Sequence, residues 1–129
     1  MVFVGTTGKF QPDTGGVFSY GQNGYKVSGL VNLINNLTAD AGQVIAVTGT
    51  GILNITGKKL TLDNTPVTGE DGARIVIGAG GSIALGASDS NYYEAGTAAA
   101  ETGPINTVAT YTWKAAAGGS TNDGWERPK

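Results

Sequence analysis

Short apolar runs recur along the middle of the chain, separated by glycine and polar residues. The runs cover residues 44–47, 51–56, 59–62, 73–77 and 82–85. All are rich in Val, Ile and Leu, and Leu60 and Leu62 share one face of their run. Gly57 and Lys58 fit a two-residue hairpin turn. Residues 43–85 are therefore predicted to form an array of short strands.

A different spacing predicts one helix over residues 28–38. Apolar residues at positions i, i+3, i+4 and i+7 share one face of a helix. The residues with this spacing are Leu30, Leu33, Ile34 and Leu37. Ser28 precedes them and suits the N-cap position. We expect the apolar face of this helix to pack on the predicted sheet.

A further strand is predicted at residues 107–113. Ala109, Tyr111 and Trp113 alternate there with Val and Thr, which is typical of a half-buried strand. Residues 86–106, which precede this strand, are expected to form a long surface loop. The fold class is mainly β with one short helix, and a short-strand sandwich, a barrel and a small β-helix-like domain all fit the pattern.

The run ILNITGKKLTLDNTPVTGEDGARIVIGAGGSIAL, residues 52–85, resembles coils of the β-helices in phage tailspikes and secreted adhesins. The resemblance lies in its β-branched residues and glycine turns. A strict repeat is absent, because the spacing between the runs varies. The resemblance therefore leaves the three architectures open.

Both ends of the chain differ from this middle part. Residues 1–26 are expected to form an extended arm in which aromatic residues alternate with glycine, although an irregular first strand fits equally well. Residues 27–114 are the β domain, and residues 115–129 are a flexible tail. Aromatic residues of the ends and of the last strand are the candidate partner-binding residues. They are Phe3, Phe10, Phe18, Tyr20, Tyr25, Trp113 and Trp125.

The composition favours a protein that binds copies of itself or a partner. Leu, Ile, Val and Phe supply 28 of the 129 residues, whereas Gly supplies 22. Small side chains bury little apolar surface, at about 25 cal/mol per Å². A chain with such a thin core gains stability by burying surface in an oligomer.

Charge and residue types exclude several classes of function. The net charge is −2 and no basic run occurs, so we expect neither a nucleic-acid partner nor a membrane partner. The chain has no Cys and no His, which removes catalysis by a thiolate or an imidazole base. No phosphate-binding glycine loop has the required spacing. We expect no enzyme activity, no cofactor and no metal.

Three weaker patterns remain. A pair of carboxylates could hydrolyse glycosides, and the candidates are Asp63, Glu70, Asp71, Asp89 and Glu94. Residues 89–94 have oxygen ligands at a loosely calcium-like spacing without the EF-hand pattern. Asn36 and Asn54 stand in N-x-[ST] sequons. We interpret all three as ordinary polar turns and chance matches.

The whole profile resembles the decoration (cement) proteins of tailed-phage capsids. The chain is small, acidic and rich in Gly, Thr and Ala, with aromatic residues at both ends and no apparent signal peptide. The resemblance implies a homo-trimer that is made in the host cytoplasm, sits on the virion surface and bridges subunits of the major capsid protein. The alternative is a phage tail-fibre, tailspike or adhesin-like carbohydrate-binding module.

Overall fold

The computed structural model describes residues 10–12, 17–21, 24–33, 35–39, 42–87, 89–114 and 124–129, and their side chains from residue 24 onward. These residues form short strands and contain no helix. Three successive triplets of strands make up the middle of the molecule. They are β3 (Gly24–Ser28), β4 (Leu30–Leu33), β5 (Leu37–Ala39), β6 (Val44–Val47), β7 (Ile52–Ile55), β8 (Lys59–Leu62), β9 (Val67–Gly69), β10 (Arg74–Ile77) and β11 (Ser82–Ala84). The prediction of a mainly β fold is confirmed.

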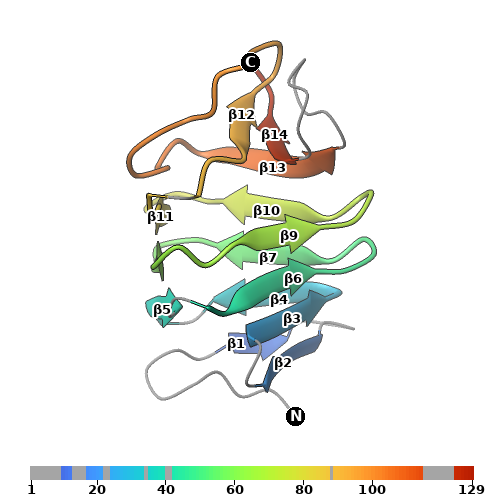
Figure 1. Cartoon of the computed structure of the whole chain (residues 1–129). Helices are drawn as coiled ribbons and strands as arrows, with labels where there is room; N and C mark the ends of the chain where they lie inside the picture. The colour runs from blue at the N-terminus through green and yellow to red at the C-terminus, as the bar shows by residue number, and fades with distance from the viewer. Residues whose placement is uncertain are drawn as a thin grey trace.

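Each triplet is one coil of a parallel solenoid (Figure 1). The strands β3, β6 and β9 pair in parallel, as do β4, β7 and β10, and also β5, β8 and β11. The three sheets form the sides of a stacked rod. Of the three architectures that the sequence leaves open, this parallel stacking is that of a small β-helix.

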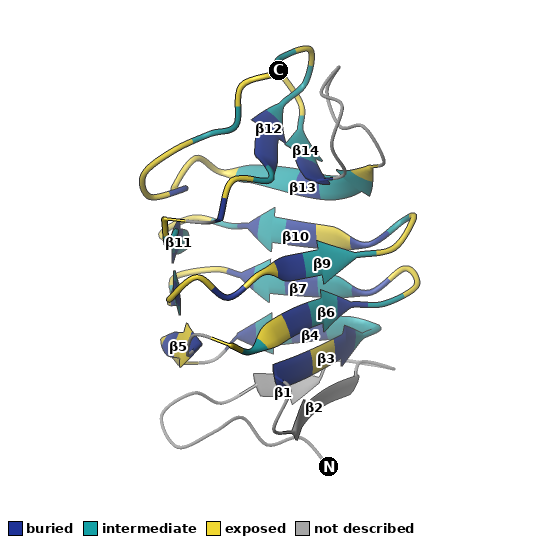
Figure 2. Ribbon diagram, viewed as in Figure 1, coloured by how far each residue is buried: buried dark blue, intermediate teal, exposed yellow. Residues whose placement is uncertain are grey.

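The coils are held in register by columns of inward-facing apolar residues. In the second sheet Val31 lies opposite Leu53 and Leu53 lies opposite Ile75, so the repeat there is 22 residues. All three side chains have no exposed surface. Buried residues alternate with partly or fully exposed ones along β7, β8 and β10 (Figure 2). Burial of such a side chain stabilises the fold by about 1.5–3 kcal/mol, so the columns supply most of the core.

The predicted helix over residues 28–38 is wrong. Its residues form the end of β3 and then β4 and β5. Leu33 and Leu37 both point inward, at 4% and 2% exposure, because a corner of the coil lies between them. Two inward positions on either side of a corner therefore reproduce the i, i+4 spacing of a helix. Ile34 lies outside the described residues.

Additional strands close the solenoid at both ends. They are β1 (Phe10–Pro12), β2 (Val17–Gly21), β12 (Tyr92–Glu94), β13 (Ala109–Lys114) and β14 (Gly124–Arg127). At the N-terminal end β1 and β2 run antiparallel to β4 and β3. At the C-terminal end β13 pairs antiparallel with β10, and β14 and β12 follow it in the same seven-stranded sheet. A bridge from Ile105 to Ile83 covers β11.

The described parts of the two ends are strands of the fold. The proposed arm, residues 1–26, includes β1, β2 and the start of β3, and Tyr25 is a core residue at 5% exposure. Phe10, Phe18 and Tyr20 stand in paired strands, and their side chains lie outside the described part. Phe3 lies outside the described residues. Within the proposed tail, residues 124–127 form β14, which pairs with β13.

The described residues contain no helix that is long and apolar enough to span a membrane.

Candidate functional site

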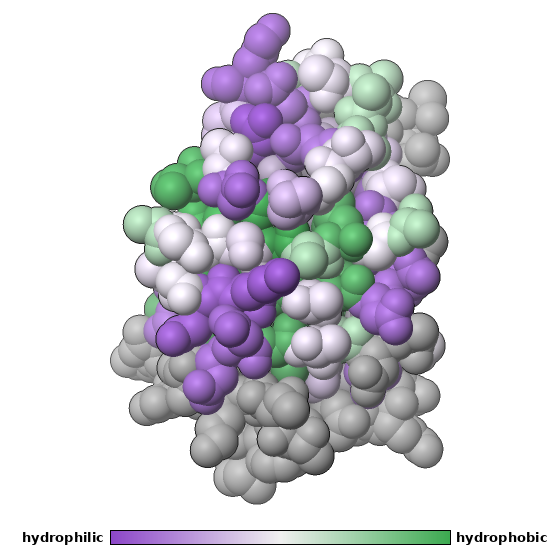
Figure 3. Space-filling view, turned by 90° about the vertical axis from the view of Figure 1, so that its left-hand side faces the viewer, coloured by the Kyte–Doolittle hydropathy of each residue, from purple (hydrophilic) through white to green (hydrophobic). Residues whose placement is uncertain are grey.

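The C-terminal cap brings polar side chains together from segments that are far apart in the sequence. Figure 3 looks onto the side of the molecule that carries β5, β8 and β11. Hydrophilic residues gather at the top of this face, over the cap, and again lower down, with apolar residues between the two groups. We therefore take the cap and the loops beside it as the candidate site.

Trp125 anchors the cap on the top coil. Its side chain has no exposed surface, and its indole N–H donates a hydrogen bond of 2.9 Å to the carbonyl of Val67 in β9. Its ring lies edge-on to that of Trp113, with 5.2 Å between the ring centroids. Gly69 leaves room for both rings, because a Cβ there would lie 2.8 Å from Cη2 of Trp125 and 2.9 Å from Cδ2 of Trp113. Trp125 thus seals the upper edge of β9 and completes the core.

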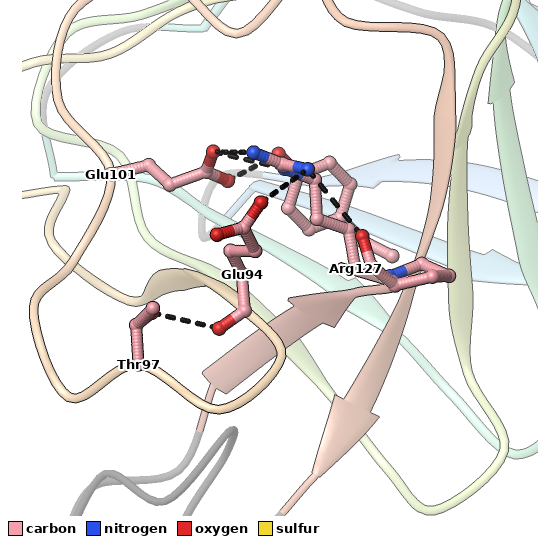
Figure 4. Close-up of polar contacts among 6 residues, drawn as sticks. Glu94, Thr97, Glu101 and Arg127 are labelled. Carbon is pink, nitrogen blue, oxygen red and sulfur yellow. Dashed lines mark hydrogen bonds and ion pairs between the residues drawn. The ribbon is translucent and has the colours of Figure 1, made fainter.

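Arg127, from the same strand, holds an ionic cluster (Figure 4). Its guanidinium lies 2.9 Å from Oε2 of Glu101 and 3.3 Å from Oε2 of Glu94. Its Nε also donates to Oε2 of Glu101 at 3.0 Å. The Glu101 hydrogen bond raises the pKa of Arg127 further above its ordinary range. The cluster ties three segments together, β12, β14 and the loop that contains Glu101.

Two buried tyrosines lie beneath this cluster. The Tyr111 hydroxyl donates a hydrogen bond to Oε1 of Glu101, and burial together with this bond raises the pKa of Tyr111. The ring of Tyr92 meets that of Tyr111 edge-on, with centroids 5.9 Å apart. The Tyr92 hydroxyl is buried without a hydrogen-bond partner in the described structure, and burial raises its pKa. Both phenols therefore stay neutral at physiological pH.

The loop between β12 and the carboxylate of Glu101 is fixed by local hydrogen bonds. Thr97 donates to the carbonyl of Glu94 through its backbone N–H at 3.1 Å and through its hydroxyl at 2.7 Å. The N–H of Glu101 then donates to the carbonyl of Tyr92 at 2.7 Å. These bonds make a closed loop that places Glu101 against Arg127.

A cavity of about 280 Å³ lies next to the cluster, above β11. Its lining comes from residues 85–87, 89–90 and 101–103. Asp89 is its most buried polar residue, at 7% exposure. The Asp89 carboxylate accepts a hydrogen bond of 2.7 Å from the N–H of Gly86, and the N–H of Asp89 donates to the Gly86 carbonyl at 3.1 Å. This pair of bonds shapes one wall of the cavity.

Burial raises the pKa of Asp89 above its ordinary value. The hydrogen bond from Gly86 opposes that rise, and the nearby charge of Asp63 adds to it. A carboxylate that is buried without a positive partner is destabilised in its charged form. Asp89 is therefore the electrostatically strained group of the site.

The geometry assigns structural roles to two of the other four candidate carboxylates, Glu70 and Glu94. Glu70 accepts a hydrogen bond of 2.5 Å from the N–H of Gly49, which joins two coils. Glu94 is paired with Arg127. Both oxygens of Glu101, a residue that the sequence pattern did not single out, are occupied by Tyr111 and Arg127. These carboxylates are held as ion-pair and hydrogen-bond partners, and Asp89 is the candidate that lines the cavity.

The two sequon asparagines also make contacts between coils. Asn54 in β7 donates its amide to the side-chain oxygen of Asn32 in β4 at 2.8 Å. The side-chain oxygen of Asn36 accepts from the N–H of Lys59 at 2.9 Å. Among the described residues, no group of three or more His, Cys, Asp or Glu is arranged to hold a metal ion.

Of the aromatic residues expected to bind a partner, three have described side chains. Tyr25 and Trp125 are buried in the core, and Trp113 packs against it. The structure brings Trp113 and Trp125 together but leaves Tyr25 in the first coil. Arg127 and Glu101 were missed because 26 residues separate them and neither stands in a recognisable motif.

No family model matches the chain, and no match is found among curated proteins or among solved structures.

Proposed function

We propose that the chain is a structural virion protein, a decoration (cement) protein that stabilises a tailed-phage capsid by bridging coat subunits. In this proposal it acts as a homo-trimer on the virion surface and is not an enzyme. Its partner is the major capsid protein or another virion subunit. The observation that carries the proposal is the closure of the solenoid described above.

Covering the ends of the solenoid is important because an uncovered edge strand can pair with a strand of another molecule. At the C-terminal end, β13 covers β10, Trp125 covers β9 and Ile105 covers β11. Among the described residues, the three strands of the top coil are therefore covered, and β12 is the outer strand of the sheet at this end. A closed rod of this kind makes its contacts through its sides, as a clamp between subunits must.

The sides carry residues suited to a flat contact. Many outward positions of the strands hold short side chains, whereas Lys26, Lys59 and Arg74 are long and charged. Examples of the short side chains are Asn32, Ala46, Ile52, Asn54, Thr61 and Thr68. Short side chains lose little rotamer entropy when a partner covers them, so such faces favour association.

The first test is co-sedimentation of the purified intact protein with shells assembled from the coat protein of the virus that encodes it. Saturable binding at a fixed ratio to coat subunits, and a solution mass of three chains, are the expected results. Absence of binding to such shells at micromolar concentration would contradict the proposal.

A carbohydrate-binding module of a tail fibre or tailspike is the second candidate. The cavity supports it, because the carboxyl-bearing Asp89 and the hydroxyl-bearing Ser90 and Thr102 all contribute to its lining. Carbohydrate-binding sites combine such polar groups with aromatic platforms, and the described rings here are mostly buried. Screening the protein on an array of bacterial surface glycans separates the two functions, since the decoration proposal predicts no hit.

A further inference from the structure

The cavity beside the C-terminal cap contains a buried carboxylate that forms no ion pair with any of the described residues. The ion pairs of the described residues join Lys114 to Glu126 and Arg127 to Glu94 and Glu101. None of these pairs reaches Asp89, which is 7% exposed and lines the cavity. The hydrogen bond from Gly86 uses one of the two carboxylate oxygens. A charge in this position is stabilised by a positive group that enters the cavity.

The surroundings of Asp89 are also negative. Glu101 lines the same cavity, and Asp63 is near enough to influence the charge of Asp89. Arg127 is shared between Glu94 and Glu101, so its single charge compensates at most one of them. The summed field therefore favours a cation over a neutral or anionic ligand.

The size and lining of the cavity restrict the kind of cation. Cavities that hold drug-sized ligands measure about 300–1,000 Å³, and this cavity, at about 280 Å³, suits a single side chain. Leu85 and Ala87 offer apolar contacts, and Ser90 and Thr102 offer hydroxyl oxygens. A calcium ion takes six to eight oxygen ligands, often from several carboxylates, and no acidic triad is present in the described part of the chain.

We propose that this cavity binds the cationic end of a Lys or Arg side chain from a partner protein. Asp89 is the counter-ion of the ammonium or guanidinium group. The hydroxyls of Ser90 and Thr102 accept its remaining N–H groups, and Leu85 and Ala87 contact the methylene stem. The inference goes beyond the capsid proposal, because any partner with a protruding basic residue can supply the group.

The test is an NMR titration of the intact, ¹⁵N-labelled protein at constant ionic strength. The probes are n-butylammonium and n-propylguanidinium, which copy the two side chains. Tetramethylammonium, which has no N–H, and calcium chloride are the controls. We expect saturable shifts of the amide signals of Gly86, Ser90 and Gly103 with both probes, and a dissociation constant of about 1 mM or lower.

Two variants and one control define the role of Asp89. Asp89→Asn keeps an oxygen that can accept the hydrogen bond from Gly86 but removes the charge, so binding should weaken at least tenfold. Ala87→Leu keeps the charge and narrows the cavity, and it should weaken binding as well. Glu70→Gln removes a carboxylate from a turn that does not line the cavity and should bind like the unchanged protein. If Asp89→Asn does not fold, the binding of the two probes to Ala87→Leu tests the proposal in its place.

The outcomes separate clearly. Absence of saturable shifts with both probes overturns the proposal, as does equal binding by the unchanged protein and Ala87→Leu. If tetramethylammonium causes the same shifts as the two probes, the shifts reflect a diffuse charge effect. If calcium binds more tightly than the probes, the cavity is a metal site. Either result would also refute the assignment to a basic side chain.

Discussion

Asp89 links the local structure of one loop to the pH dependence of the whole fold. Its folded-state pKa lies above the ordinary value, so the folded protein retains this proton at a pH where the unfolded chain has lost it. The stability that this group contributes is fully present below the ordinary Asp pKa of about 3.9. It is lost as the pH rises through the folded-state pKa.

Asp89→Asn should therefore stabilise the protein at neutral pH and leave its stability nearly unchanged at about pH 3. The amide stays uncharged at every pH and retains an acceptor for Gly86. Urea denaturation of the variant and the unchanged protein at both pH values measures the difference. An equal loss of stability at both values would show that the carboxylate is needed for its hydrogen bond alone.

Trp125 provides a second prediction for a single residue. Trp125→Ala should lower the free energy of unfolding by about 3–5 kcal/mol, since it leaves a cavity between β9 and β14. Trp125→Phe keeps a ring but removes the indole donor, so the Val67 carbonyl keeps only the longer hydrogen bond of 3.4 Å from the Asn91 amide, at a cost of about 1 kcal/mol. Chemical denaturation followed by circular dichroism compares the two. A negligible effect of the alanine variant would mean that the cap is not part of the cooperative unit.

The burial of Trp125 could not be predicted from the sequence alone. Its hydrogen-bond partner is 58 residues away, and a Trp among Gly, Asn and Asp has no local pattern that places it in a core. By contrast, the burial of Leu60 and Leu62 follows from their alternation. Local periodicity reports which face is apolar, but it does not report which distant segment covers an end.

At the scale of elements, the strands of residues 43–85 were predictable except for β9, and those of the first coil were not. Runs such as β7 and β10 alternate cleanly between inward and outward positions. In the first coil, the corner between β4 and β5 places Leu33 and Leu37 at a helical spacing. The strand β9 has only three residues and lies between turn sequences, so the sequence pattern presents it as loop.

The corners of the coils give a testable contrast between two glycines. A Cβ on Gly81 would overlap the backbone carbonyl of Ile55 in the coil below. Gly49 has open space around its Cα but a φ of +57°. Gly81→Ala should therefore lower the free energy of unfolding more than Gly49→Ala does. The overlap at Gly81 costs about 1–3 kcal/mol or more, whereas the left-handed backbone at Gly49 costs about 1 kcal/mol. Thermal melts of both variants test this order, and the reverse order would mean that the coils are not stacked in this register.

For the whole molecule, the stacking of the coils could not be derived from the spacing of the runs. Neighbouring coils are offset by 22 residues at Val31 and Leu53 but by 23 at Leu37 and Leu60. The first and second coils are offset by 20 residues at Val27 and Val47. Such unequal offsets conceal the repeat, because corners of different length separate strands that nevertheless stack in register.

Paired cysteines test the parallel register directly, because the chain has no Cys of its own. Ala46 and Thr68 are outward-facing neighbours on β6 and β9. The double variant Ala46→Cys/Thr68→Cys should form a disulfide on mild oxidation, since neighbouring strands lie about 4.7–4.9 Å apart, within the Cα separation of about 4.4–6.8 Å that disulfides allow. Ala46→Cys/Thr61→Cys, with the second cysteine on a different sheet, is the control. Efficient disulfide formation in the control alone would contradict the three-sheet arrangement.

Binding to a coat lattice through one side of the closed solenoid is the central claim of the functional account. The most direct measurement is the affinity for coat-protein shells of three variants, each with one outward lysine on a different sheet: Ile52→Lys, Thr61→Lys and Thr68→Lys. All three should melt like the unchanged protein, because these side chains point outward. We predict that at least one of them lowers the affinity more than tenfold while another leaves it unchanged. Equal binding by all three variants, or no binding by the unchanged protein, would contradict the claim.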